Sequence, residues 1–254
     1  MAFMQCRLHS AALGKAVEVN VVYPTAAGKP SKVVYLLHGL SDDASIWFRR
    51  TSIERYADQR NIAVVMPDGG RGFYTDAVQG ANYWSYVAEE LPKQMQEIFR
   101  LPAERENTFA AGLSMGGYGA LKLALRCPEK FAAAGALSAV TDVKYRFRAA
   151  DSASWQPELR RIFGGVSQLA ARGNDLFALA ETAVACGGEL PKLLSICGTD
   201  DFMIRDNRRF NAHLVRLKYP DFHAYERPGT HNWEFWDAHI PELLDFFLSG
   251  KLPE

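Results

Sequence analysis

The chain has 254 residues, of which 48% are hydrophobic and 23% are charged, and its 29 basic and 29 acidic side chains give a formal net charge of zero. A chain of this length buries enough apolar surface to fold without disulfides or a structural metal. The balanced charge gives no electrostatic reason to expect nucleic acid or an anionic membrane as a partner, and it leaves little repulsion to oppose a homo-oligomer.

Short apolar runs typical of strands alternate with helical patterns, which predicts a mostly parallel sheet covered by helices. We expect strands over 3–9, 15–23, 32–37, 62–66, 108–113, 132–137, 193–197 and 223–226, the first two as an antiparallel pair. We expect helices over 83–99, 115–125, 204–217 and 233–247, the first of them kinked at Pro92. This order of elements predicts the α/β-hydrolase fold, with a doubly wound sheet of about eight strands in a single domain over 1–254.

The stretch from 139 to 191 is longer than a usual connection between a strand and the next element. It carries helical patterns, for example at 157–163 and 176–186. We therefore expect a small, cap-like helical insertion at about 140–190. Such a cap would lie over the carboxyl ends of the strands, where ligands bind in this architecture.

The cysteines and the N-terminal segment indicate the cellular compartment in which we expect the protein. Cys6, Cys127, Cys186 and Cys197 lack the C-x-x-C spacing of a metal or redox site, and their scatter fits reduced thiols. The N-terminal segment has no basic start followed by a long apolar run, as a signal peptide would, and no apolar stretch is long enough to span a bilayer. We therefore expect a cytoplasmic protein that uses no cofactor and no metal ion.

A match to G-x-S-x-G, the nucleophile elbow, lies between an expected strand and an expected helix. It is GLSMG at 112–116, with Ser114 at its centre. The chemistry needs a serine at the top of a very sharp strand-to-helix turn, and glycine on both sides permits that turn and the close packing around it. The pentapeptide alone is a weak signal, but its place between a strand and a helix makes Ser114 the candidate nucleophile.

The position of the base follows from chain order. A serine hydroxyl needs an adjacent base to become a good nucleophile, and this fold sets the order as serine, acid, then histidine. After Ser114, His213 and His239 lie in expected helices and His223 opens a strand. His231 lies in the loop between the last strand and the last helix, from which the fold presents its base.

The acid is expected after the strand at 193–197, where Asp200 and Asp201 compete for the role. A G-x-x-D turn commonly presents the acid at its fourth position, which favours Asp201. Asp200 would then be a turn residue or the cap of the following helix. The acid would hold the imidazole tautomer and stabilise the imidazolium.

The oxyanion of the reaction needs two backbone N–H donors, one from the residue after the nucleophile and one from the loop after the third strand. These are Met115 and Leu40, and we expect the His38 ring to order the second loop without transferring a proton. The aromatic candidates for the substrate pocket are Trp47, Phe73, Tyr74, Tyr83, Trp84, Trp233 and Trp236. Of these we select Trp47, Trp84 and Trp233.

Five segments carry a resemblance to a known family: LHGL at 37–40, VMPD at 65–68, FYTD at 73–76, AEELP at 88–92 and AGLSMGGYGA at 111–120. From about residue 36 to 236, the chain resembles the esterase D-like family, and most closely its tributyrin esterases. Relatives include S-formylglutathione hydrolases, feruloyl and acetylxylan esterases, and mycolyltransferases. The resemblance implies carboxylesterase activity on short acyl chains without a cofactor, often in an oligomer. It also implies Ser114, Asp201 and His231 as the triad, with Leu40 and Met115 as oxyanion donors.

Two segments bear on the substrate. Formylglutathione hydrolases usually have a cysteine shortly after the oxyanion glycine, whereas this chain has LSDD at 40–43, which favours esters over glutathione thioesters. GTHNWEFW at 229–236 resembles the histidine loop of feruloyl esterases, so a plant cell-wall ester stays an alternative. We expect a serine carboxylesterase for small-molecule, short-chain acyl esters. The rival interpretations are an acyltransferase to an acceptor other than water and a non-catalytic binding protein of the same fold.

Overall fold

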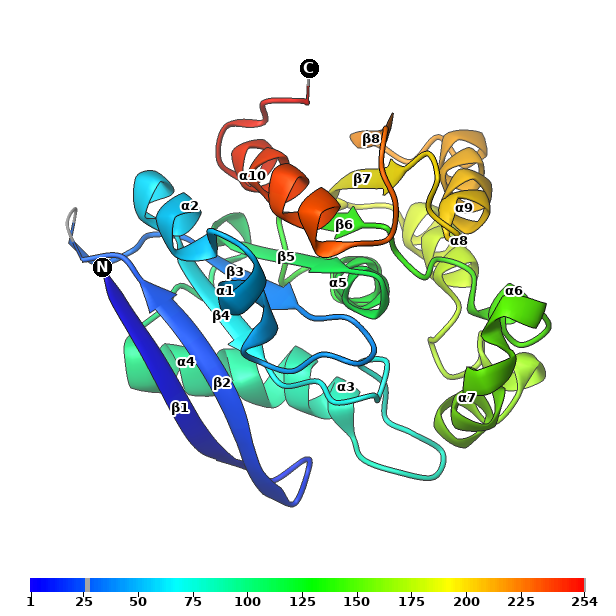
Figure 1. Ribbon diagram of the computed structural model, residues 1–254, viewed down its shortest axis with the longest axis horizontal. Helices are drawn as coiled ribbons and strands as arrows, with labels where there is room; N and C mark the ends of the chain where they lie inside the picture. The colour runs from blue at the N-terminus through cyan, green and yellow to red at the C-terminus, as the bar shows by residue number, and fades with distance from the viewer. Residues whose placement is uncertain (26–27, 254) are drawn as a thin grey trace.

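The computed structural model describes residues 1–25 and 28–253, and one eight-stranded sheet forms the centre of this part of the chain (Figure 1). The strands are β1 (Ala2–Ser10), β2 (Lys15–Tyr23), β3 (Val33–Leu37), β4 (Ala63–Pro67), β5 (Thr108–Leu113), β6 (Ala133–Leu137), β7 (Lys192–Gly198) and β8 (Phe222–Arg227). Their order in the sheet is β1-β2-β4-β3-β5-β6-β7-β8. β2 runs antiparallel to β1 and to β4, and all other neighbours are parallel. The predicted α/β-hydrolase fold, with its mostly parallel sheet and opening antiparallel pair, is confirmed.

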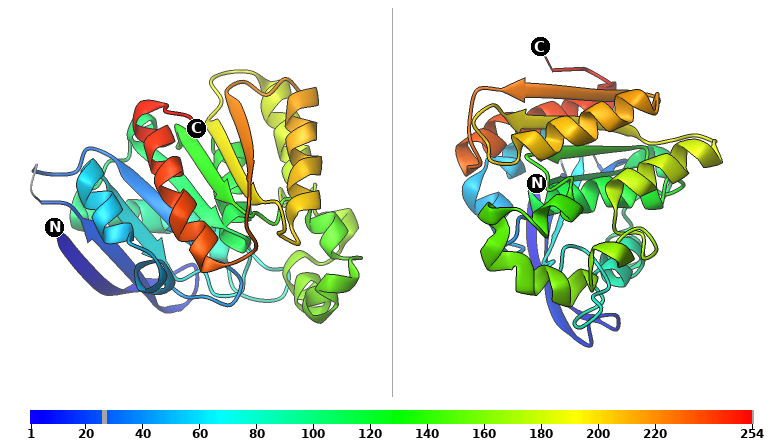
Figure 2. Two further views of the ribbon diagram at one scale, coloured as in Figure 1. Left: turned by 45° about the horizontal axis from the view of Figure 1, so that its top comes forward. Right: turned by 90° about the vertical axis from the view of Figure 1, so that its right-hand side faces the viewer.

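Helices cover both faces of the sheet (Figure 2). They are α1 (Ile46–Arg50), α2 (Ile53–Arg60), α3 (Tyr83–Ser85), α4 (Leu91–Phe99), α5 (Met115–Arg126), α6 (Val143–Arg146), α7 (Gln156–Phe163), α8 (Leu176–Cys186), α9 (Ile204–Arg216) and α10 (Trp233–Ser249), with the π-helical turn η1 (Tyr86–Glu90) and the 3-10 turns η2 (Arg105–Asn107), η3 (Ala150–Trp155) and η4 (Val166–Gln168). The core on one face includes α1, α2 and α10, and the core on the other includes α4, α5, α8 and α9. β3 supplies both, because Val34 and Leu36 face the first core while Val33 and Tyr35 face the second.

Two helices between β3 and β4 were not predicted. α1 has five residues and α2 has eight, so neither contains enough turns to show a clear helical period. α2 buries only Ile53 and Ala57, and the remainder of its sequence is largely polar. The local sequence therefore carries little signal, and packing against β2 and α10 fixes these helices instead.

The helix predicted over 83–99 is interrupted, as expected from Pro92, by the π-helical turn η1 between α3 and α4. Proline has no N–H to donate to the carbonyl four residues earlier, here that of Ala88. The Lys130 Nζ donates to that carbonyl instead, at 3.1 Å. A side chain from outside the helix thus donates to the carbonyl that the proline cannot bond, and the helix continues as α4 after the π-helical turn.

The region expected as a helical insertion, about 140–190, divides into two parts. α6 and α7 lie beside the carboxyl ends of the parallel strands (Figures 1 and 2), whereas α8 packs against α5 and α9 in a layer that covers the sheet. A buried ion pair joins α6 to α9, with the Arg146 Nε 2.7 Å from the Asp206 Oδ2. The Val78 N–H donates to the Ile162 carbonyl at 2.8 Å and ties α7 to the loop after β4. Both anchors hold the insertion close to the ends of the strands.

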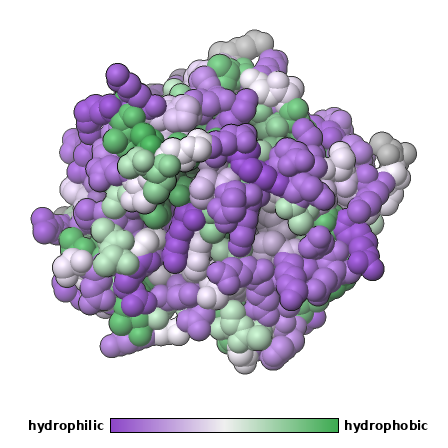
Figure 3. Space-filling view, turned by 180° about the vertical axis from the view of Figure 1, so that it is seen from behind, coloured by the Kyte–Doolittle hydropathy of each residue, from purple (hydrophilic) through white to green (hydrophobic). Residues whose placement is uncertain are grey.

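The face turned away from the viewer of Figure 1 is largely hydrophilic, and apolar residues form small, separate groups on it (Figure 3). Among residues 1–25 and 28–253, no helix combines the length and the apolar character needed to cross a bilayer.

The ion pair between Arg146 and Asp206 gives a test of how the insertion is anchored. Arg146→Met should lower the free energy of unfolding by about 3 kcal/mol, because it removes the buried partner of the Asp206 carboxylate and leaves this carboxylate paired with the half-exposed Arg209. Urea denaturation measures this change. Arg208→Met is the matched control, since Arg208 pairs with Glu226 with similar geometry at an exposed site and should matter little. Equal losses of unfolding free energy in Arg146→Met and Arg208→Met would contradict the claim that burial makes the first ion pair matter more.

Candidate active site

Ser114 occupies a strained turn between the end of β5 and the start of α5. Its φ is +51° and its ψ is −114°, a conformation that costs a non-glycine residue energy. Two glycines make the turn possible. A Cβ on Gly112 would lie 2.5 Å from the Gly116 carbonyl oxygen, and one on Gly116 would clash with the Leu37 carbonyl oxygen. The G-x-S-x-G pattern is therefore a steric requirement of this turn.

The neighbouring strand β6 and the segment after it fix the backbone of the turn. The Ser114 N–H donates to the Leu137 carbonyl at 2.9 Å, and the Ser114 carbonyl accepts from the Val140 N–H at 3.1 Å. Both partners come from β6 and the segment just after it. Only 7% of the surface of Ser114 is exposed, but its side chain lines an open cleft. The fold thus presents a hydroxyl at the surface of an otherwise rigid turn.

Asp201 and His231 meet across two loops at the same edge of the sheet. Asp201 follows β7, and His231 lies between β8 and α10. The His231 Nδ1 is 3.0 Å from the Asp201 Oδ1 and 2.9 Å from the Oδ2. Because an ionised carboxylate only accepts hydrogen bonds, the Nδ1 carries the proton and the Nε2 is left as an acceptor. This is the tautomer that a general base needs.

The geometry favours Asp201 over Asp200 as the acid. Asp201 is buried, and its Oδ1 also accepts from the Met203 N–H at 2.7 Å. Asp200 is exposed, and its Oδ2 accepts from the Thr199 hydroxyl at 3.1 Å. Asp200 is therefore a turn residue, whereas the Asp201 carboxylate holds the imidazole of His231.

The imidazole of His231 is clamped between two aromatic rings. The Phe202 ring lies 4.6 Å from it between centroids, and the Trp236 ring lies 4.9 Å away and perpendicular to it. The Trp236 Nε1 donates to the Ser138 hydroxyl at 3.2 Å, which fixes that ring in turn. These ring contacts keep the imidazole in the orientation in which it hydrogen-bonds to Asp201.

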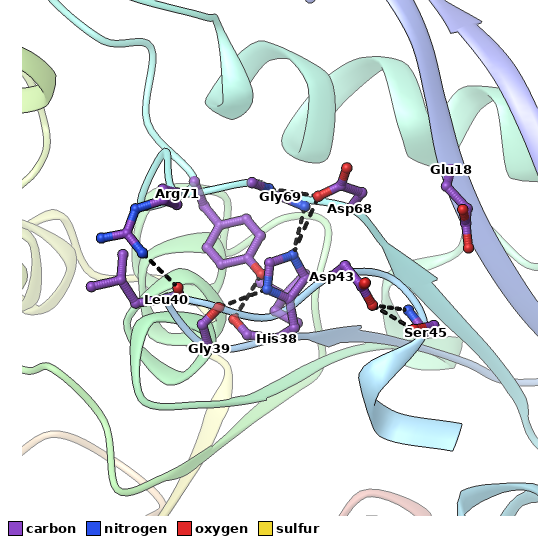
Figure 4. A network of polar contacts seen from close by, with 12 residues as sticks. Glu18, His38, Gly39, Leu40, Asp43, Ser45, Asp68, Gly69 and Arg71 are labelled. Atoms are coloured by element: carbon purple, nitrogen blue, oxygen red, sulfur yellow. Dashed lines mark hydrogen bonds and ion pairs between the residues drawn. The ribbon is translucent and has the colours of Figure 1, made fainter. Parts of the chain in front are cut away.

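The loop after β3, residues 38–42, carries the expected oxyanion donor Leu40 and is called the oxyanion loop below. His38 holds this loop in place (Figure 4). The His38 Nε2 accepts from the Gly69 N–H at 2.8 Å, so its Nδ1 carries the proton and donates to the Gly39 carbonyl at 2.7 Å. A Cβ on Gly39 would lie 3.9 Å from the Ser114 Cβ, which places this loop directly beside the serine. The buried His38 ring orders the loop, as predicted, and is fully used in doing so.

The two expected oxyanion donors lie on either side of Ser114. Met115 is the first residue of α5, where N–H groups have no partner within the helix. Leu40 follows Gly39 in the oxyanion loop and lines the cleft together with Ser114. In the described part of the chain, neither N–H donates to another protein group. Both are therefore available for a negatively charged oxygen bound beside Ser114.

The cleft has a volume of about 630 Å³ and brings together residues from eight segments of the chain. Its aromatic lining consists of Phe73, Trp155, Phe202, Trp233 and Trp236. Trp155 and Phe202 were not among the aromatic candidates from the sequence. Phe202 could have been found from its place directly after the acid, but nothing in the sequence around Trp155 places it beside Ser114.

Two of the three tryptophans selected from the sequence lie outside this lining. Trp47 is buried behind the cleft wall, where its ring packs edge-on against Trp233 at 5.2 Å between centroids. Trp84 lies in the other core, beneath the side chains of Lys122 and Arg126. The expectation for Trp47 and Trp84 is corrected on this ground, whereas Trp233 does line the cleft.

Charged side chains of both signs line the cleft: Arg50, Arg71, Asp42 and Glu234. Arg71 is paired with Glu158 of α7, with the Arg71 Nε 2.9 Å from the Glu158 Oε1. Burial raises the pKa of the Asp42 carboxyl. Across residues 1–25 and 28–253, no group of three or more His, Cys, Asp or Glu side chains is placed to hold a metal ion.

The two adjacent aspartates give a test of the acid. Asp201→Asn should lower kcat for p-nitrophenyl acetate by about 10⁴-fold, because the amide would no longer hold the imidazole in the required tautomer. Steady-state kinetics of both variants measure the effect. Asp200→Asn is the matched control and should change kcat little, since Asp200 does not contact His231. A larger loss in Asp200→Asn than in Asp201→Asn would show that the acid is assigned to the wrong residue.

Known proteins resemble this chain along nearly its whole length. The family model Esterase, described as "Putative esterase", matches residues 10–247. An acetyl esterase from Caldicellulosiruptor saccharolyticus is 31% identical over 265 aligned residues, which cover 97% of this chain and 98% of that protein.

Two solved structures from Staphylococcus aureus share the architecture closely. A fluorophosphonate-binding serine hydrolase, solved with substrate bound, superposes with a TM-score of 0.89 at 33% identity and with 98% of each chain covered. An S-formylglutathione hydrolase superposes with a TM-score of 0.86 at 33% identity, covering 98% of this chain and 99% of that one. Together with the family match over residues 10–247, these similarities show that the chain belongs to the esterase D-like family of α/β-hydrolases.

Proposed function

We propose that this protein is a serine carboxylesterase that hydrolyses esters of short acyl groups through a covalent intermediate on Ser114. The observation that carries the proposal is the 2.9 Å contact between the His231 Nδ1 and the Asp201 carboxylate in a cleft that Ser114 also lines. A protein that only binds a ligand has no need of a buried carboxylate, an imidazole oriented by it and a strained serine turn at one site.

In the first step, the Ser114 Oγ attacks the ester carbonyl carbon while the His231 Nε2 accepts its proton. The carbonyl π electrons move to the oxygen, and the N–H groups of Leu40 and Met115 bind the resulting oxyanion. The imidazolium stays paired with the Asp201 carboxylate. His231 then protonates the leaving alcohol as its bond to carbon breaks, which leaves the acyl group on Ser114.

In the second step, water takes the place of the alcohol. His231 removes a proton from the water, whose oxygen attacks the acyl carbon, and the oxyanion forms again between the same two N–H groups. Its collapse breaks the bond to the Ser114 Oγ, which recovers its proton from His231. The carboxylic acid leaves and the enzyme is restored.

The preference for short acyl groups rests on the relatives and on the cleft. The relatives described above include an acetyl esterase and an S-formylglutathione hydrolase, and acetyl and formyl are both small acyl groups. Phe73, Trp155 and Phe202 wall the cleft with rigid apolar surface. The similarity to the S-formylglutathione hydrolase makes a glutathione thioester the second candidate substrate. We propose a small-molecule ester as the substrate, and a homo-oligomeric state and a cytoplasmic location stay predictions from the sequence.

A panel of substrates tests the proposal. We expect hydrolysis of p-nitrophenyl acetate and butyrate by the wild type, a steep fall for long acyl chains, and loss of this activity in Ser114→Ala because the nucleophile is gone. The panel also holds S-formylglutathione and methyl ferulate, and added alcohols reveal transfer to an acceptor other than water.

Each outcome of the panel has a distinct meaning. Faster turnover of S-formylglutathione than of any ester would make the thioester the substrate class, and a dominant transesterification product would make the protein a transferase. Ester hydrolysis unchanged in Ser114→Ala, or absent in the wild type, would contradict the proposed function.

A further inference from the structure

The loop between β4 and α3 contains two consecutive non-glycine residues in left-handed backbone conformations. Phe73 has a φ of +48° and Tyr74 a φ of +46°. Such residues cost energy and persist where the surroundings hold them in place. Both side chains are fully buried, although Phe73 also forms part of the cleft wall. The strain therefore lies beside the active site, in a segment that the triad itself does not use.

A slot formed by two glycines holds the Tyr74 ring. A Cβ on Gly69 would clash with the Tyr74 ring, and one on Gly119 would lie 2.5 Å from the Tyr74 Cδ2. Gly69 belongs to the loop after β4, and Gly119 belongs to α5, the helix that begins directly after Ser114. The ring is thus enclosed between the nucleophile helix and the segment that hydrogen-bonds to His38.

The Tyr74 hydroxyl reaches the oxyanion loop. It donates to the His38 carbonyl at 2.9 Å, while the His38 ring donates to the Gly39 carbonyl at 2.7 Å. The Gly39 carbonyl and the Leu40 N–H belong to one planar peptide unit, so holding that carbonyl sets the direction of the N–H. Tyr74 holds the peptide unit before it. Two consecutive peptide planes of the loop are therefore fixed by side chains.

Lys122 anchors Tyr74 from α5. Its fully buried Nζ lies 3.1 Å from the Tyr74 carbonyl oxygen and 2.8 Å from the Thr75 hydroxyl. Burial lowers the pKa of Lys122 well below its usual value, and the amine has N–H groups for both acceptors whether or not it is protonated. Burial also raises the pKa of Tyr74 well above its usual value, so its hydroxyl stays protonated and remains a donor.

We propose that Tyr74 is a positioning residue for the oxyanion hole, and that Lys122 holds it in place. The chain of hydrogen bonds from Lys122 through Tyr74 to His38 ties the oxyanion loop to α5, whose first N–H is the other donor. The two donors, Leu40 and Met115, thereby keep a fixed separation while the oxyanion forms. This inference rests on the proposed function, because it assigns a role within that reaction.

The test compares buried tyrosines that each donate to a backbone carbonyl. Tyr74→Phe removes the bond to the oxyanion loop, and the control Tyr219→Phe removes the 2.9 Å bond from the Tyr219 hydroxyl to the Pro191 carbonyl. Loss of an oxyanion donor costs about 10² to 10³ in kcat, so we expect a misaligned donor in Tyr74→Phe to cost about 10-fold, with KM little changed. Tyr219→Phe should leave kcat near that of the wild type.

A second readout separates positioning from stability. A trifluoromethyl ketone adds to the active serine and places a negative oxygen in the oxyanion hole. Its Ki should rise in Tyr74→Phe by the same factor as kcat falls, and not in Tyr219→Phe. Lys122→Met, measured below its own Tm, should likewise lower kcat and raise Ki. If that variant does not fold, Tyr74→Phe decides alone.

The possible results distinguish the two claims. The wild type could be active while Tyr74→Phe keeps the same kcat and Ki and loses Tm only as Tyr219→Phe does. That result would overturn the positioning role and leave the proposed function intact. A wild type that hydrolyses neither ester nor thioester would overturn the proposed function and, with it, this inference.

Discussion

The backbone at Ser114 turns back on itself at a φ of +51°, and the two flanking glycines press against the Leu37 carbonyl of β3 as it does so. This close approach has two consequences at once. It lifts the serine hydroxyl above the end of β5, and it draws the loop after β3 to the side of the serine. A single steric constraint therefore brings together the two segments that carry Leu40 and Met115, the expected oxyanion donors.

The parallel sheet supplies the rest of the site. β3, β5, β7 and β8 end at the same edge, so the loops that follow them converge although the chain separates Gly39 from His231 by most of its length. A second glycine contact lets two of these loops meet, since a Cβ on Gly198 would clash with the Gly229 carbonyl. Asp201 and His231 are carried by those two loops. The insertion then closes one side of the cleft with Trp155.

The sequence predicted the features that depend on local pattern or on chain order. The strands and the long helices follow hydrophobic periodicity, and Ser114 and His231 follow from a motif and from position along the chain. The residues that line the pocket could not be predicted in this way. The sequence shows that an aromatic side chain is apolar but not whether it packs in a core or lines a cleft. Trp84 was expected in the cleft, but it packs in the core beneath Lys122 and Arg126. Trp155 reaches the cleft through the packing of α6 and α7, which no local pattern encodes.

Reaction of Ser114 with a fluorophosphonate tests most directly whether this serine is the activated nucleophile of the cleft. After treatment, intact mass followed by peptide mapping counts the adducts and locates them. We expect one adduct per chain, on the peptide that contains Ser114, and none in His231→Ala over the same time, because the hydroxyl then lacks its base. Absence of an adduct, an adduct at another residue, or equal labelling in His231→Ala would contradict it.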